Sequence, residues 1–122
     1  MKRTAAVAVL ALLAVSAPAD AKKKLTHAES VALFHSGPCH EAVDEIMPEE
    51  VRAFFHKIVN RESGGREWAT NTNRNGSTDG GCLQINSIHG VPNSCRLEAR
   101  CNVQFALKLY KKVGTSPWRA TR

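Results

Sequence analysis

The sequence lacks the motifs that mark several common functional classes. It has no Cys-x-x-Cys spacing, which a compact zinc site would need. It has no glycine-rich phosphate loop, no recognisable nucleic-acid-binding motif and no internal repeat. Its 122 residues are enough for one small domain but not for two. We therefore expect a single domain with no metal, no cofactor and no nucleic-acid partner.

Long apolar runs are also missing, except near the N-terminus. There a basic start precedes the apolar run Ala5–Val15, which is too short to span a bilayer comfortably. Small residues follow, and Ala19-x-Ala21 fits the specificity of signal peptidase. We predict a cleaved secretory signal over residues 1–21, with an uncleaved anchor as the alternative. The mature chain would then be a secreted extracellular, periplasmic or cell-wall protein.

The cysteines are few but even in number. In a secreted chain, four cysteines predict two disulfides, and so small a domain gains much stability from them. Four cysteines allow three pairings, and the sequence does not choose among them. We favour a short local loop between Cys95 and Cys101, which leaves Cys39 to pair with Cys82.

Basic residues outnumber acidic ones, 17 to 11. The formal net charge is +6, of which the predicted signal contributes +1, so the mature chain carries +5. Basic secreted proteins meet anionic partners by electrostatic steering. Bacterial walls, nucleic acids and membranes are all anionic, so the charge alone does not choose among them.

Hydrophobic periodicity predicts several helices. We expect short helices over Leu25–Phe34 and His40–Met47, and a stronger one that begins at Pro48, a good first-turn residue. Gly64-Gly65 would end this stronger helix. Its apolar residues recur at the spacing of an amphipathic helix: Val51, Phe54, Phe55, Ile58 and Val59.

The second half of the chain predicts a β-hairpin followed by a helix. Asn75-Gly76 between threonine-containing flanks indicates the hairpin turn. Leu83 and Ile85 would be buried on a short strand or a helical turn, and Ile88–Ser94 would be a loop. A last helix is expected from about Glu98 to Val113. The predicted class is α+β, mainly helical, with the small hairpin forming one wall of a cleft.

Two carboxylates stand out as candidates for acid–base chemistry. Glu62 follows Ile58 by four residues and Val59 by three, so it falls on the apolar face near the end of its helix. Burial and the exposed helix carbonyls would both raise the pKa of such a carboxyl group, which could then act as a general acid. Asp79 lies in a polar turn and should stay ionised. Glycoside hydrolysis uses such a pair, although a solvated helix end and a turn aspartate are the more ordinary interpretations.

Three stretches of the sequence resemble the lysozyme superfamily. They are Arg61-Glu62-Ser63-Gly64, residues 73–79 (Asn-Arg-Asn-Gly-Ser-Thr-Asp) and residues 81–87 (Gly-Cys-Leu-Gln-Ile-Asn-Ser). The gap from Glu62 to Asp79 is similar to that of the animal, chicken-type lysozymes. The tail, Gly114-x-Ser116-Pro117-Trp118, resembles bacterial and phage lysozyme-like or soluble-lytic-transglycosylase domains instead. The resemblance covers about residues 48–118.

The resemblance implies a lysozyme-like fold and a specific substrate. The partners would be peptidoglycan glycan strands, cut at the β-1,4 bond between N-acetylmuramic acid and N-acetylglucosamine. Glu62 would be the general acid, and Asp79 the nucleophile or charge-stabilising group. Further cleft residues would bind sugar or hold the aspartate: Asn73, Gln84 and Asn86. His89, which follows this motif, is a candidate substrate contact. Trp118 is a candidate cleft wall and equally a core residue.

The sequence also departs from the pattern of these families. Gly80 stands where an aromatic residue often follows the aspartate, and Ile88-His89-Gly90 replaces the paired tryptophans of the animal enzymes. Lytic transglycosylases often have a tyrosine on the last helix near the acid. The corresponding position here is Leu109, with Tyr110 beside it. The four cysteines do not reproduce the animal lysozyme framework.

Several functions remain open at this point. Water would be the acceptor in a hydrolase, whereas in a lytic transglycosylase the muramic 6-hydroxyl closes on itself to give an anhydro product. Asp79 favours hydrolysis and the tail favours transglycosylation. A non-catalytic wall- or glycan-binding protein on the same scaffold is a further alternative, as is a cationic antimicrobial protein that acts on membranes. We expect a monomer without stable membrane insertion after signal cleavage.

Overall fold

The computed structural model describes residues 26–28 and 35–121. The predicted signal peptide and most of the predicted helix Leu25–Phe34 lie outside these residues. Within the described ranges, no helix is both long and apolar enough to cross a bilayer. The elements in chain order are α2 (Pro38–Ile46), α3 (Glu49–Glu62), β1 (Thr70–Thr72), β2 (Thr78–Gly80), β3 (Ile85–Asn86), the 3-10 turn η1 (Ser87–His89), α4 (Asn93–Arg96), α5 (Ala99–Val113) and the 3-10 turn η2 (Ser116–Thr121).

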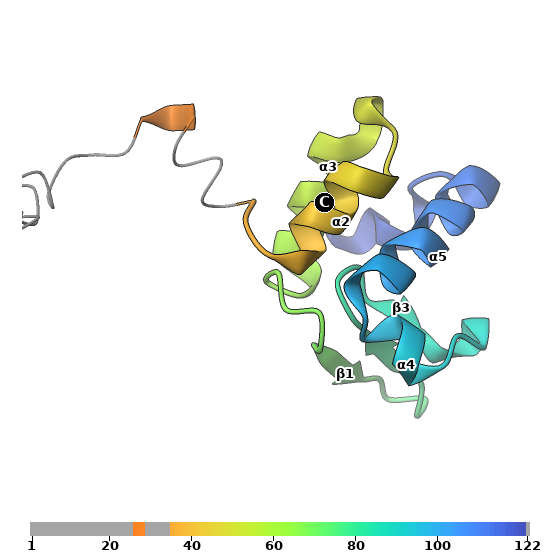
Figure 1. The fold of residues 1–122 in the computed structure, drawn as a ribbon. Helices are drawn as coiled ribbons and strands as arrows, with labels where there is room; N and C mark the ends of the chain where they lie inside the picture. The colour runs from red at the N-terminus through yellow and green to blue at the C-terminus, as the bar shows by residue number, and fades with distance from the viewer. Residues whose placement is uncertain (1–25, 29–34, 122) are drawn as a thin grey trace, which may run out of the picture.

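The predicted α+β class is confirmed. Figure 1 shows the small sheet and α4 at one end of the molecule, with α2, α3 and α5 above them. The strand order is β1-β2-β3, and both pairings are antiparallel. Asp79 lies on the central strand, opposite Asn71 on β1 and Asn86 on β3. The predicted position of the hairpin turn is therefore confirmed, and the segment around Ile85 is a strand.

The ends of the long helices follow local signals. Pro48 precedes α3, whose first turn carries Glu49 and Glu50. These acidic side chains are favourable near the positive end of the helix dipole. The carboxylate of Glu98 caps α5 by accepting the backbone N–H groups of Arg100 and Cys101, at 3.2 and 2.7 Å. Both predicted helices are confirmed within about a residue at their starts.

The prediction of a loop over Ile88–Ser94 is wrong, because two short helical turns occupy much of it. The side chain of Asn86 accepts the backbone N–H of Ile88 at 3.0 Å and so caps η1. Pro92 is the residue before α4, where its fixed φ and missing N–H favour a helix start. Both signals are local, but each turn is too short to show helical periodicity in the sequence.

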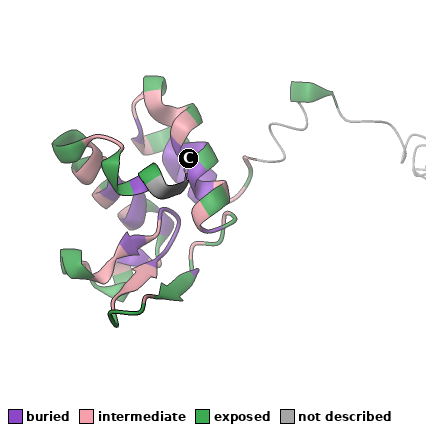
Figure 2. Cartoon of the chain, turned by 180° about the vertical axis from the view of Figure 1, so that it is seen from behind, coloured by how far each residue is buried: buried purple, intermediate pink, exposed green. Residues whose placement is uncertain are grey.

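The core forms where the helices meet the turn between β2 and β3, and Figure 2 shows the buried segments gathered at the centre of the molecule. Phe55 is fully buried, and the rings of Trp118 and Tyr110 meet it edge-on, with centroids 5.1 and 5.7 Å away. Each fully buried side chain of this size contributes about 1.5–3 kcal/mol. Other fully buried members come from every long helix: Val43, Ile58, Val59, Val103 and Ala106.

Two disulfides cross-link these elements. Cys39–Cys82 joins α2 to the turn after β2, and Cys95–Cys101 joins α4 to α5. This is the pairing that the sequence analysis favoured. Cys39 and Cys82 are 43 residues apart, and closing a loop of that size stabilises a fold by about 4 kcal/mol in the chain-entropy model.

The turn after β2 is fixed by the side chain of Asn102, which is 1% exposed. Its Oδ1 accepts the backbone N–H of Leu83 at 3.0 Å, and its Nδ2 donates to the carbonyl oxygens of Gly80 and Arg96, both at 2.9 Å. Gly81 lies next to Asn102 and Arg96, and its backbone has a φ of +82°. A Cβ at Gly81 would lie 1.8 Å from the Arg96 carbonyl oxygen, so only glycine fits.

We predict that Gly81→Ala lowers the free energy of unfolding far more than Gly90→Ala. Gly90 also has a positive φ, +72°, but no atom lies within 4 Å of an added Cβ. Gly90→Ala therefore carries only the backbone cost, about 1 kcal/mol, whereas Gly81→Ala adds a steric clash and should cost about 3 kcal/mol or more. Urea unfolding of the two variants measures the difference, and equal losses would refute the close packing around the turn.

Candidate active site

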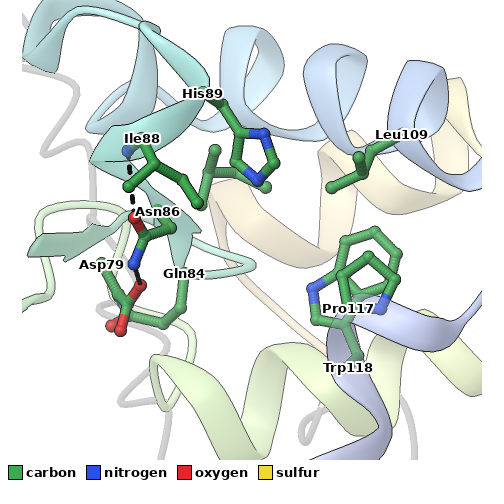
Figure 3. A pocket seen from close by; sticks show the side chains of 9 residues that line it. Asp79, Gln84, Asn86, Ile88, His89, Leu109, Pro117 and Trp118 are labelled. Atoms are coloured by element: carbon green, nitrogen blue, oxygen red, sulfur yellow. Dashed lines mark hydrogen bonds between the residues drawn. The ribbon is translucent and has the colours of Figure 1, made fainter. Parts of the chain in front are cut away.

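A pocket of about 300 Å³ lies between the sheet and η2 (Figure 3). Five of the predicted site residues line it: Asp79, Gln84, Asn86, His89 and Trp118. The remaining lining residues are apolar: Ile85, Ile88, Leu109 and Pro117. Within the described chain, Glu62 and Asn73 are not part of this lining. The pocket thus has a polar wall from the sheet and an apolar wall from α5 and η2.

Asp79 is held by two asparagines. Its Oδ1 accepts the Nδ2 of Asn86 at 2.8 Å, across the β2–β3 pairing, and its Oδ2 accepts the Nδ2 of Asn73 at 3.0 Å, from the hairpin turn. The Oγ of Ser77 accepts the same two amide groups at 3.1 and 3.2 Å. Hydrogen bonds to a carboxylate are stronger than neutral ones, so this clamp fixes the carboxylate at the pocket wall.

Gln84 forms a different part of the polar wall. Its φ of +49° lies in the left-handed region, which is uncommon for a residue with a side chain. Its Nε2 donates to the carbonyl oxygens of Ala69 and Gly81 at 3.0 and 2.9 Å, and its Oε1 accepts the Nδ2 of Asn71 at 2.8 Å. Gln84 therefore joins β1 to the turn after β2. None of these three hydrogen bonds involves Asp79.

Trp118 is both a core residue and a pocket wall. It is 3% exposed, and its Nε1 donates to the carbonyl oxygen of Leu83 at 3.0 Å. Beside it, Leu109 of α5 lines the pocket, while the ring of Tyr110 packs against Phe55 in the core. Figure 3 shows Leu109 and Trp118 on the side of the pocket opposite Asp79. The last helix thus presents a leucine to the pocket and packs its half-buried tyrosine against the core.

The rim of the pocket is exposed and partly apolar. Ile88 is 77% exposed, and His89 is exposed with its ring 5.5 Å from that of Phe105. Both come from η1, and Ile88 is the apolar side chain that this turn offers at the rim.

Glu62 lies half-buried at the last position of α3. This helix packs against η2 through Phe55 and Trp118, and its ribbon crosses below the pocket in Figure 3. Ser63 follows and is buried; its Oγ donates to the Val59 carbonyl at 3.0 Å and accepts the N–H of Gly65 at 3.2 Å. Glu62 is therefore held at the end of α3 and is not part of the pocket lining.

Arg96 is a structural residue of the site that sequence reasoning missed. It is buried, and its Nη1 donates to the carbonyl oxygens of Thr78 and Ile85, both at 3.0 Å. Its Nη2 donates to the Oγ1 of Thr78 at 3.1 Å. Arg96 thus joins β2 to β3 beside Asp79. Nothing in the sequence distinguishes this arginine from the solvated ones, because its partners lie far away along the chain.

Three histidines form a stack between α2 and α3, away from the pocket. The ring of His56 lies 4.3 Å from that of His35 and 4.9 Å from that of His40, centroid to centroid. The Nδ1 atoms of His40 and His56 are 2.7 Å apart, and the Nε2 of His56 lies 2.6 Å from Asp44 Oδ1. In the part of the chain that the structure describes, no three His, Cys, Asp or Glu side chains are arranged to hold a metal ion.

Burial shifts the protonation of this stack. Desolvation is the largest cause that lowers the pKa of His35 and of His40 below 6.5, and the neighbouring His56 lowers both further. A hydrogen bond to Asn60 and the carboxylate of Asp44 act in the opposite direction on His40. The unfolded chain therefore binds more protons than the folded one just below pH 6.5, and the free energy of unfolding falls as the pH falls through this range.

We predict that His35→Gln flattens this pH dependence. The variant removes one imidazole from the stack, and therefore one group whose folded form resists protonation. Urea unfolding at a series of pH values from about 7.5 downward through 6.5 measures the slope. A His35→Gln protein with the wild-type slope would refute the contribution of the stack.

Comparison with known protein families and with curated proteins finds no match to this chain.

Proposed function

We propose that this chain is a secreted, peptidoglycan-cleaving glycosidase with a lysozyme-like fold. The observation that carries the proposal is the carboxylate of Asp79, clamped by Asn73 and Asn86 at the wall of a pocket whose other wall is Trp118. Sugar sites commonly combine polar groups with aromatic or apolar surface in this way. The motif that resembles the lysozyme superfamily supplies the second carboxylate, Glu62.

In the proposed reaction, the two carboxylates act on opposite parts of one bond. Glu62 donates a proton to the glycosidic oxygen between N-acetylmuramic acid and N-acetylglucosamine, so that this oxygen leaves as a hydroxyl group. Asp79 stabilises the positive charge that develops at the sugar carbon, attacks that carbon or positions the incoming water. Water then supplies the hydroxyl group of the new reducing end and returns a proton to Glu62. The division of roles follows the lysozyme resemblance.

Hydrolysis is favoured over transglycosylation by two features of the pocket. Asp79 has both carboxylate oxygens held in place, which suits a group that must act on the sugar carbon. Leu109 faces the pocket while the half-buried Tyr110 packs against Phe55, so Tyr110 is not among the residues that line the pocket. Lytic transglycosylation remains the alternative, because the tail that ends at Trp118 resembles that branch and its chemistry can use one carboxylate.

Two further properties support a role at the cell wall. The disulfides Cys39–Cys82 and Cys95–Cys101 suit an oxidising compartment outside the cytosol. The net charge, +6 for the whole chain and +5 without the predicted signal, favours association with the anionic polymers of bacterial walls.

We predict that Glu62→Gln lowers the rate of wall clearing by at least about a hundredfold, because glutamine cannot donate the proton. The assay is the loss of turbidity of a suspension of purified cell walls. Glu50→Gln is the matched control, since Glu50 lies exposed in the first turn of the same helix. It should clear walls at the wild-type rate.

The alternative functions give different results in this assay. Equal clearing by wild type and Glu62→Gln, or clearing by neither, would contradict the enzyme assignment. Clearing by neither together with retained wall binding would indicate the non-catalytic binding protein. Killing of intact bacteria that survives the Glu62→Gln substitution would instead indicate action on membranes.

A further inference from the structure

A second pocket lies along α5 next to the first. It has a volume of about 360 Å³ and is lined by His89, Phe105, Lys108, Leu109 and Lys112. His89 and Leu109 line both pockets, so the second continues from the rim of the first. The α5 residues follow the spacing i, i+3, i+4, i+7, which places them on one face of the helix.

The chemistry of this second pocket is cationic and partly apolar. Lys108 and Lys112 are exposed, and Phe105 is half-buried with its ring 5.5 Å from that of His89. None of the residues that line it is acidic. Two ammonium groups one helical turn apart can meet carboxylates on a flexible chain, while Phe105 and Leu109 offer apolar contact to its aliphatic parts.

We propose that this pocket binds the carboxylate-bearing peptide stem of a peptidoglycan strand whose sugars lie in the Asp79 pocket. This inference rests on the proposed function. The stem is covalently joined to the muramic sugar, so a stem that branches from a sugar in the first pocket can reach a surface that shares His89 and Leu109 with it. That continuity favours a branch of the bound strand over a separate anionic wall polymer as the occupant.

The stem contact should raise affinity without taking part in bond cleavage. Exposed ion pairs are individually weak, so removal of one lysine should weaken binding by about two- to fivefold, and removal of both by about tenfold. The contribution should also decrease as salt is added, because both ammonium groups are solvated. Fragments that lack peptide stems should bind with the same affinity whether or not the lysines are present.

The test measures binding of two soluble glycan fragments of equal length, one with peptide stems and one from which an amidase has removed them. The full mature chain carries Glu62→Gln so that neither fragment is cut during the calorimetric titration. We expect the fragment with stems to bind about tenfold more tightly, and Lys108→Gln/Lys112→Gln to abolish that preference. Lys111→Gln is the matched control, because Lys111 is an exposed lysine of α5 that does not line the pocket.

The outcomes separate this inference from the proposed function. Equal affinity for both fragments, or the same loss from Lys111→Gln as from Lys108→Gln/Lys112→Gln, would overturn the stem site while leaving the glycosidase proposal intact. Displacement of the stem-bearing fragment by poly(glycerol phosphate), with no preference for stems, would assign the lysines to wall phosphates and also overturn it. Failure to bind either fragment would contradict the proposed function itself.

Discussion

The turn between β2 and β3 must enter the core without leaving its backbone groups unpaired, and the buried amide of Asn102 makes this possible. That one side chain satisfies three backbone groups, from Gly80, Leu83 and Arg96. Each buried polar group left without a partner would cost about 1–3 kcal/mol. The close approach that these bonds require is also why Gly81 cannot carry a side chain. Asn102 belongs to α5, so the same bonds fix the sheet relative to that helix.

Both walls of the candidate active site depend on this turn. The strands that it joins carry Asp79 and Asn86, which form half of the carboxylate clamp. On the other side, Trp118 is fixed by its hydrogen bond to the Leu83 carbonyl, a group of the same turn. Leu109, which faces the pocket from α5, is placed by the helix that carries Asn102. A small domain can thus hold an open pocket because both of its walls are hydrogen-bonded to the same turn between β2 and β3.

Local signals allowed the main elements to be predicted, and long-range contacts account for most of what was missed. The helix α3, Glu49–Glu62, has a clear apolar period and defined ends, and the hairpin has its Asn-Gly turn. The roles of Asn73 and Asn86 could be expected only from the resemblance to lysozymes. The histidine stack could not be predicted, because His40 and His56 lie on different helices and meet only after these have packed. Contacts between residues so far apart along the chain produce no periodic pattern in the sequence.

We propose that this chain cleaves peptidoglycan with water as the acceptor. Mass spectrometry of the products formed from purified peptidoglycan in heavy-oxygen water tests it most directly. We predict fragments with reducing muramyl ends that have incorporated one heavy oxygen from the solvent. Fragments with only anhydromuramyl ends and no heavy oxygen would contradict hydrolysis and assign the chain to the lytic transglycosylases.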